Sequence, residues 1–220
     1  LDRSSAASDV YKRQVRYHAL CGTRHPGPAQ HCDLVTAMQP TLFTQRLILH
    51  PLTLEDAEDT QAQFAHWDVV RYLSAEVPWP YPADGARRYL EQVALPGMAR
   101  GDQWHWSIRL KHAPQQLIGN INLTDEQDDN RGFWLGPQWQ GQGFMTEACA
   151  AVTEYWFDVL KRPRMRVPKA APNLASRRIS ERTGMRLIRT QMGEFVEGTL
   201  PRDIWEITRE EWLVFRSSKR

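Results

Sequence analysis

A loop with two closely spaced glycines precedes the clearest helical pattern in the chain. The loop reads Gln138-x-x-Gly141-x-Gly143, and helix-forming residues follow it. Glycine costs backbone entropy, so it is favoured where the backbone bends sharply or lies very close to another group. A strand, a glycine loop and a helix in this order direct bare N–H groups and the positive end of a helix dipole at one point. Such a point suits a phosphate or a pyrophosphate, although the same glycines also fit a plain turn.

The spacing of these glycines excludes two common phosphate-binding loops. Position 146 is Thr, so the G-x-G-x-x-G fingerprint fails, and the G-K-[ST] end of a P-loop does not follow. A dinucleotide-binding fold would also carry its loop after the first strand, whereas this loop follows the fourth predicted strand. The anion-binding interpretation therefore depends on the elements around the loop.

Three segments before the loop predict the strands that position it. Residues 104–110 and 116–123 alternate in polarity and are joined by "KHAPQ", which is typical of an antiparallel pair. Residues 131–136, "RGFWLG", follow as the next strand, so a meander is the simplest topology. A first strand is predicted earlier, at residues 46–52.

One apolar stripe predicts a long helix directly after the loop. Its members recur at i, i+3, i+4, i+7, i+11 and i+14, which is the pattern of a helix with one buried face. They are Met145, Ala148, Cys149, Val152, Trp156 and Val159. Pro163 sets the end of this helix.

The remaining segments predict a single α+β domain. Further helices are expected at 53–67, 83–98 and 173–184, and further strands at 164–171, 185–195 and 202–212. The proline-rich loop 77–82 fits neither a helix nor a central strand. Pro168 weakens the second half of the strand that contains it, because proline cannot donate to a ladder.

Residues 1–37 are left out of the predicted domain. The stretch "SSAASDVYKRQ" looks like the translation of a sequencing adapter, and an upstream-like tail follows it. Neither contains an apolar run long enough for a signal peptide or a membrane span. The domain is therefore expected to run from Met38 to Arg220.

Leaving out this segment changes the charge and the cysteine count. Its five basic and three acidic residues account for the whole-chain surplus of two, so the domain is neutral, which argues against a nucleic-acid binder. Cys21 and Cys32 also lie there, and the remaining Cys149 forms neither an internal disulfide nor a metal site alone. We expect a cytoplasmic domain without metal, nucleic acid or membrane contact.

Two stretches together carry a family resemblance. "FWLGPQWQGQGFMTEA", followed later by "NLASRRISERTGMRLI", resembles the GNAT superfamily of acyl-CoA-dependent N-acetyltransferases. Within it, the chain is most similar to the Rim-like branch, named for enzymes that acetylate N-termini of ribosomal proteins. The resemblance runs from about Thr41 to Trp212. It implies a GNAT-like fold, with a mixed, mostly antiparallel central sheet of about seven strands flanked by about four helices.

The resemblance implies that acetyl-CoA binds along the fourth strand and the glycine loop. The strand, which contains Phe133, Trp134 and Leu135, would bind the pantetheine arm as if it were an added strand. The loop would hold the pyrophosphate through backbone N–H groups. Its residues are Trp139, Gln140, Gly141, Gln142, Gly143, Phe144 and Met145.

The resemblance also assigns roles on the short helix. Asn173 would face the pantetheine amide, and Ser176 would lie near the thioester sulfur and protonate the departing thiolate. The alternatives are a simple N-cap for Asn173 and a surface hydroxyl for Ser176. Arg178 could pair with a phosphate of CoA or remain solvated.

Direct attack on the thioester needs a neutral amine, and therefore a base or a water relay. Many relatives place a carboxylate on or before the fourth strand, but this strand has none. The loop before it offers Asp125, Glu126, Asp128 and Asp129, a run that also fits a solvated turn. Glu147, in the first turn of the helix, fits a structural role beside the helix dipole.

Aromatic residues outside the loop give weaker signals. Trp79 lies in the region that covers the acceptor in this branch, so it either lines the amine pocket or anchors the core. Trp104 and Trp106 share one strand face and fit the core, whereas His105 faces the other way and fits a solvated side chain.

The sequence therefore predicts an acetyl-CoA-dependent N-acetyltransferase acting on a primary amine, which is a protein N-terminus or a small molecule. Cys149 lies on the apolar stripe, so attack without an acyl-enzyme is expected. The domain would act as a monomer or a homodimer. The alternative is a catalytically silent acyl-CoA-binding sensor or interaction module, which the missing strand carboxylate favours.

Overall fold

The structure, a computed structural model, describes residues 39–218. The strands are β1 (Leu42–Phe43), β2 (Leu47–Pro51), β3 (Gln103–Leu110), β4 (Ala113–Thr124), β5 (Arg131–Leu135), β6 (Arg164–Ala170), β7 (Arg186–Phe195) and β8 (Gly198–Thr208). The helices are α2 (Ala57–Phe64), α3 (Trp67–Val70), α4 (Gly85–Tyr89), α5 (Leu95–Arg100), α6 (Phe144–Glu154), α7 (Leu174–Arg182) and α8 (Arg209–Ser217). The predicted adapter-like segment lies outside the described residues.

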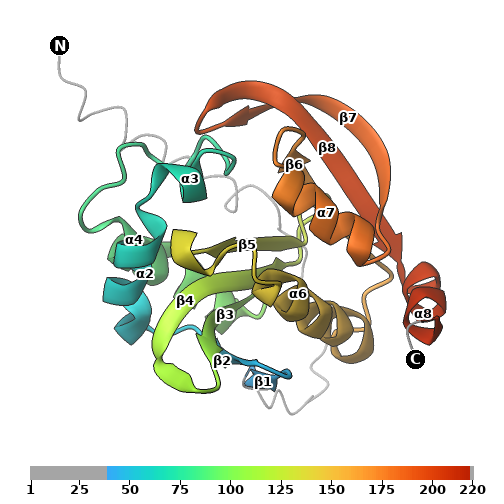
Figure 1. The fold of residues 1–220 in the computed structure, drawn as a ribbon, viewed down its shortest axis with the longest axis horizontal. Helices are drawn as coiled ribbons and strands as arrows, with labels where there is room; N and C mark the ends of the chain where they lie inside the picture. The colour runs from blue at the N-terminus through green and yellow to red at the C-terminus, as the bar shows by residue number, and fades with distance from the viewer. Residues whose placement is uncertain (1–38, 219–220) are drawn as a thin grey trace, which may run out of the picture. The chain divides into compact units, whose positions relative to one another are not determined.

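The strands form two sheets instead of the one central sheet that the sequence predicts. The first has the order β1-β2-β3-β4-β5 and contains the expected meander, while the second has the order β6-β8-β7 (Figure 1). Every neighbouring pair is antiparallel. The α+β class is confirmed, with eight strands and helices on both faces of the first sheet among the described residues.

The main core lies between the first sheet and α6. Ala148, Cys149 and Val152 are fully buried there, as the apolar stripe predicts. The last member of the stripe is wrong, because the Val159 side chain is 59% exposed. A π-helical turn at Tyr155–Val159 explains this. The turn has more residues per turn than an α-helix, so Val159 at its end is rotated away from the buried face.

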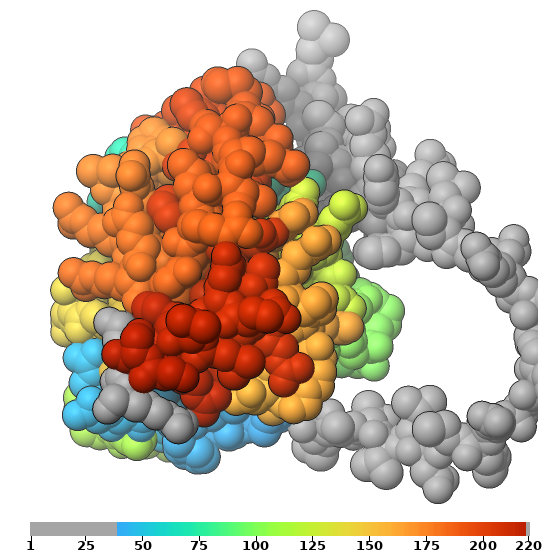
Figure 2. Space-filling view, turned by 90° about the vertical axis from the view of Figure 1, so that its right-hand side faces the viewer, coloured from blue at the N-terminus to red at the C-terminus, as the bar shows by residue number. Residues whose placement is uncertain are grey.

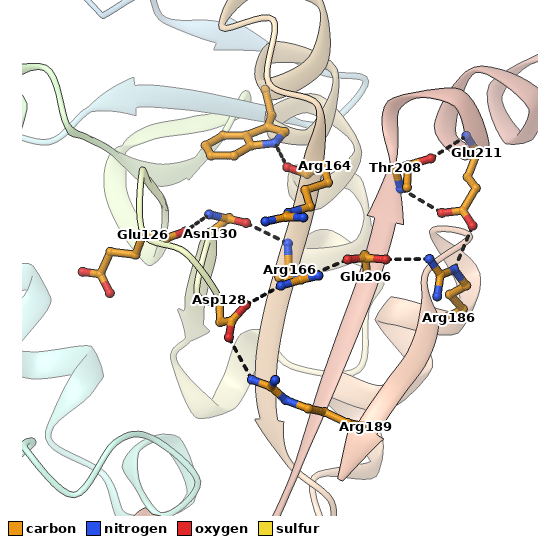
Figure 3. A network of polar contacts seen from close by, with 11 residues as sticks. Glu126, Asp128, Asn130, Arg164, Arg166, Arg186, Arg189, Glu206, Thr208 and Glu211 are labelled. Atoms are coloured by element: carbon orange, nitrogen blue, oxygen red, sulfur yellow. Dashed lines mark hydrogen bonds and ion pairs between the residues drawn. The ribbon is translucent and has the colours of Figure 1, made fainter. Parts of the chain in front are cut away.

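A polar network joins the two sheets where β5 begins (Figure 3). The Asn130 N–H donates to the Arg166 carbonyl at 2.7 Å, and the Arg166 N–H donates to Asn130 Oδ1 at 2.8 Å. The Arg166 guanidinium also contacts Asp128 and Glu206, both at 2.7 Å. Beyond this point β5 and β6 belong to different sheets, so no strand pairs with the outer edge of β5 in the described structure.

Pro168 does not shorten its strand, contrary to the sequence interpretation. β6 continues to Ala170, and Pro168 lies opposite Ile204 of β8. β6 is an edge strand with β8 as its ladder partner, and Arg166 turns its own backbone groups away from β8, toward Asn130. Backbone groups alternate in direction along a strand, so Pro168 points the same way and removes no ladder hydrogen bond.

The predicted last strand is too long. β8 ends at Thr208, and α8 follows on the surface shown in red in Figure 2. A capping box starts this helix: the Glu211 N–H donates to Thr208 Oγ1 at 3.2 Å, and the Thr208 N–H donates to the Glu211 carboxylate at 2.8 Å. Trp212 then stacks on Phe157 with ring centres 5.0 Å apart.

The expected environment of His105 is also wrong. Its side chain is 1% exposed, and a ring nitrogen lies 2.9 Å from Gln103 Oε1. Burial lowers the pKa of His105 to about 4, so the ring is neutral and has a structural place in the sheet. Trp106 is fully buried and Trp104 packs against the core, as predicted. Across residues 39–218, the helices are all too short or too polar to cross a bilayer.

Candidate functional site

The glycine loop ends at the N-terminus of α6, as the sequence predicts. Gly141 and Gly143 have φ values of +75° and +81°, which side chains with a Cβ rarely adopt. The first intrahelical hydrogen bond runs from the Glu147 N–H to the Gly143 carbonyl at 3.1 Å, so the N–H groups of Phe144, Met145 and Thr146 precede it. Space beside Gly141 is open, since an added Cβ would meet nothing within 4 Å.

The side chains of the loop point in different directions. Phe144 and Met145 are buried in the core, so only their backbone N–H groups could bind a ligand. Trp139 is half-buried, while Gln140, Gly141, Gln142 and Gly143 are exposed. The arrangement suits an anion held by backbone groups.

Glu147 fixes the loop against the start of the first sheet. Its carboxylate accepts from Thr44 Oγ1 at 2.5 Å and from the Arg46 N–H and Nε, both at 2.7 Å. Arg46 Nη1 donates in turn to the Gln142 carbonyl at 3.1 Å. Burial raises the pKa of Glu147, but the hydrogen bonds from Thr44 and Arg46 outweigh it and hold the pKa below its usual range. The structural reading of Glu147 therefore holds, while Arg46 was not anticipated.

Within residues 39–218, β5 offers an edge without a strand partner beside the loop. Phe133, Trp134 and Leu135 pair with Ile121, Asn120 and Gly119 of β4 on the inner side. Gln140 Nε2 donates to the Leu135 carbonyl at 3.1 Å and ties the loop to the end of this strand. An exposed strand edge can bind an extended ligand through its free backbone groups.

α7 begins at the other side of this edge. Asn173 is its N-cap, and its side-chain oxygen accepts from the Ser176 N–H at 3.0 Å. Ser176 is not a surface hydroxyl, because it is 8% exposed and accepts a hydrogen bond from Lys169 Nζ at 3.0 Å. The same ammonium lies 5.7 Å from the ring centre of Phe133. Strands β5 and β6 and helix α7 therefore meet at Lys169.

Lys169 is the residue that sequence reasoning missed. Burial, and next the positive charge of Arg131, lower the pKa of Lys169 to about 7. Met165, Val167 and Lys169 alternate along β6 and are all buried, so the period of two could have placed the lysine on the inner face. Pro168, which lies between Val167 and Lys169, made this half of the strand look weaker than it is.

The acids before β5 have unequal surroundings. Asp125 pairs with Arg162 at 2.6 Å, and Asp128 pairs with Arg166 and Arg189. The hydrogen bond from Arg166 chiefly lowers the pKa of Asp128. The surface of Asp129 is open to solvent, yet enough protein surrounds its carboxyl that desolvation, followed by the charge of Glu126, raises its pKa to about 7.

Two predicted residues are not drawn into this group. Arg178 is exposed on α7, and no contact with the loop or with Lys169 is found in the described part of the chain. Trp79 is 43% exposed, and its ring centre lies 5.4 Å from that of Trp67. A hollow of about 370 Å³ lies elsewhere, between α2 and α4, and contains none of the predicted site residues. Within residues 39–218, His, Cys, Asp and Glu form no cluster that could hold a metal ion.

Comparison with protein families gives one match over most of the described domain. Residues 46–186 match the family described as "Acetyltransferase (GNAT) domain". The match includes β5, the glycine loop, α6 and α7, and ends at the first residue of β7.

Individual proteins are similar over a larger part of the chain. An Aspergillus fumigatus protein, "FsC-acetyl coenzyme A-N(2)-transacetylase", is 27% identical over 190 residues, covering 80% of this chain and 79% of that protein. Among solved structures, a ribosomal-protein-S5-alanine acetyltransferase from Vibrio fischeri superposes with a TM-score of 0.67 at 12% identity, covering 79% of this chain and 98% of that one. RimL, a ribosomal L7/L12 α-N-protein acetyltransferase solved with coenzyme A, gives a TM-score of 0.61 at 15% identity, covering 75% and 95%.

Proposed function

The chain belongs to the GNAT acetyltransferase family and is an acyltransferase, and we propose that it moves the acetyl group of acetyl-CoA to a primary amine. The observation that supports this most is the arrangement at α6. A helix N-terminus with a positive-φ glycine loop lies next to a strand edge that has no strand partner in the described part of the chain, and a lysine–serine pair lies beside that strand.

The residues present fit acetyl-CoA as the donor. The N–H groups of residues 144–146 and the open space beside Gly141 would receive the pyrophosphate, and Arg178 would pair with a phosphate. The outer edge of β5 would bind the pantetheine arm. Asn173 uses its side-chain oxygen in the helix cap, so its Nδ2 group is the part that would face the pantetheine amide.

The transfer itself needs one group to take a proton and another to give one. Asp129, with its pKa near 7, is the acid of the preceding loop best suited to take the proton of the attacking amine. Ser176 would protonate the thiolate that leaves. Cys149 is fully buried, and burial raises the pKa of its thiol, which agrees with attack without an acyl-enzyme.

The acceptor is a primary amine on a protein N-terminus or on a small molecule. Trp79 is the residue proposed to line the acceptor pocket, and its contact with Trp67 would make the wall aromatic. Such a wall would favour an amine as a cation over a neutral polar group before the amine loses its proton.

The experiment measures release of free CoA from acetyl-CoA by the full chain. N-terminal peptides, amino acids, polyamines and aminoglycosides are offered as acceptors, and acetyl-CoA is tested separately for a rise in melting temperature. Gly141→Val should abolish release and stabilisation. Gly101→Val is the matched control. Gly101 also has a positive φ, +77°, and an added Cβ there would also meet nothing within 4 Å, but this glycine ends α5, far from the loop in the chain.

The outcomes separate the proposal from its alternative. Release with one acceptor class, lost only in Gly141→Val, supports the enzyme and identifies the class of its substrate. Stabilisation without release for every acceptor would favour a silent acyl-CoA sensor. No stabilisation of the wild-type chain would overturn the assignment of the loop.

A further inference from the structure

Lys169 and Ser176 form a buried donor pair between β6 and α7. We infer that Lys169 supplies, through the Ser176 hydroxyl, the proton that the departing CoA thiolate takes up. The inference rests on the proposed function, because it assigns the source of a proton in that reaction. Lys169 would act through Ser176 and would not itself contact the sulfur.

The geometry gives the pair a defined direction. Lys169 Nζ donates to Ser176 Oγ at 3.0 Å, so the hydroxyl hydrogen of Ser176 is free to point elsewhere. The Lys169 ammonium also lies 5.7 Å from the ring centre of Phe133, on the strand whose outer edge would bind the pantetheine arm. The pair therefore lies beside the strand that the proposed donor would occupy.

Lys169 lacks the partner that a structural buried lysine normally has. It is 7% exposed, and within residues 39–218 no carboxylate forms an ion pair with it. Burying an unpaired ammonium is costly, and neutralisation is the usual response. Because burial disfavours the charged ammonium, the buried Lys169 gives up its proton more readily than a lysine in water.

Every charged group that faces Lys169 can be named by its element. Arg131 of β5 repels the ammonium, whereas Asp129 before β5 and Asp203 of β8 attract it, and the Cys149 thiol of α6 would attract it when ionised. Burial is the largest effect, and the pKa of Lys169 falls to about 7. Lys169 therefore exchanges its proton near neutral pH.

The step balances in atoms and charge. The acceptor ammonium first loses one proton to solvent. The neutral amine nitrogen then forms a bond to the acetyl carbon, and the C–S bond breaks as the sulfur takes the hydroxyl proton of Ser176. The Ser176 oxygen takes a proton from the Lys169 ammonium, which becomes neutral. Asp129 accepts the proton that the amine loses, and both groups return to their starting states through solvent.

The test that does not depend on turnover is the titration of CoA bound to the full chain, followed by thiolate absorbance. A protonated Lys169 beside Ser176 should stabilise the thiolate. The thiol pKa, taken from the ionised fraction at pH 6–7 where Lys169 still carries its proton, should therefore be about one unit lower in the wild type than in Lys169→Met, which is similar in length but uncharged. Lys111→Met, at an exposed lysine in the turn after β3, is the matched control and should leave the thiol pKa unchanged.

The second test is the pH dependence of turnover. Wild-type kcat should fall as the pH rises above about 7 and Lys169 loses its proton, whereas Lys169→Met should lower kcat by about 10- to 100-fold and lose this alkaline limb. Ser176→Ala keeps the lysine but breaks the relay, so adding Lys169→Met to it should cause little further loss. An equal thiol pKa in wild type and Lys169→Met, or fully additive losses in the double variant, would overturn the inference.

Failure of the proposed function gives a different pattern. If the wild type lowers the thiol pKa of CoA but acetylates no amine, the position of Lys169 is supported and the assigned reaction is not. If CoA does not bind to the wild type at all, as judged by the melting temperature, both are overturned. Should Lys169→Met fail to fold, the pH profile of Ser176→Ala decides the question. Loss of the alkaline limb would support the inference, and a retained alkaline limb would overturn it.

Discussion

At the scale of single residues, Asp129 differs from Asp125 and Asp128 in that it forms no ion pair with an arginine within residues 39–218. Its raised pKa, near 7, predicts the acidic limb of a bell-shaped profile, along which kcat increases as the pH rises toward 7 and the carboxyl loses its proton, before the alkaline limb set by Lys169. Asp129→Asn should lower kcat by about 100-fold or more and remove this acidic limb. Initial rates of CoA release across pH 5.5–9 at saturating acceptor provide the measurement.

The control for Asp129 is the acid that the structure shows to be paired. Asp125→Asn removes a charge from the same loop, but only breaks an exposed ion pair with Arg162. It should leave kcat within about twofold, because exposed pairs contribute little. An equal loss in both variants would indicate that the charge of the loop matters and not the Asp129 carboxyl.

Asn173 caps α7 through its side-chain oxygen, and we propose that its Nδ2 group binds the pantetheine arm. Asn173→Ser keeps a capping oxygen for the Ser176 N–H but removes the amide donor, so the melting temperature should barely change. The affinity for acetyl-CoA should fall by about tenfold if the Nδ2 group binds the pantetheine. Isothermal titration with acetyl-CoA measures this, and unchanged affinity would leave Asn173 as a cap alone.

At the scale of elements, Glu147 holds the glycine loop to the first sheet. Glu147→Gln should reduce the free energy of unfolding by about 1–2 kcal/mol at pH 7, because a charged acceptor of three hydrogen bonds becomes neutral. It should also weaken acetyl-CoA binding, since Arg46 would no longer fix the Gln142 carbonyl.

The pH dependence of that loss follows from the lowered pKa of Glu147. The folded state holds the carboxylate below its usual pKa, so the stabilisation is complete above the unfolded value of about 4.3 and disappears as the pH falls through the folded value. Urea unfolding of wild type and Glu147→Gln at pH 7 and at pH 3.5 should therefore show a difference that shrinks with acid. A constant difference would contradict the ionised role.

At the scale of the whole molecule, Arg166 links the loop before β5 to the second sheet. Arg166→Met would leave Asp128 and the buried Glu206 without this partner, so we expect a loss of about 2–3 kcal/mol in the free energy of unfolding. Arg162→Met, which breaks an exposed pair, should cost less than about 1 kcal/mol. Urea titrations followed by fluorescence and by circular dichroism compare the two.

The sequence predicted the parts of the fold that depend on local patterns. The meander, the stripe on α6 up to Trp156 and the Asn173 cap all follow from period and capping chemistry, and the structure has them. Val159 and His105 were wrong because a π-helical turn and burial by distant segments decide their environments. Helix α8 was missed although its capping box, Thr208-x-x-Glu211, is a local signal in the sequence.

The candidate site shows the same division. Gly141 and Gly143 were found from the sequence, because backbone positions with a positive φ favour glycine. The Lys169–Ser176 contact joins two elements, and the raised pKa of Asp129 depends on how the protein surrounds it. Neither can be read from spacing along the chain, although the inward face of β6 already pointed to Lys169.

Pro168 has a consequence for which conformations the chain avoids. Strands β5 and β6 leave a common junction, and each has one edge without a strand partner in the described structure. Two such edges would be expected to pair with each other and form one continuous sheet. The backbone of Pro168 faces β5 but has no N–H to donate. Pairing between β5 and β6 ends after the hydrogen bonds between Asn130 and Arg166. The missing N–H of Pro168 therefore removes one hydrogen bond that continued pairing of β6 with β5 would otherwise gain.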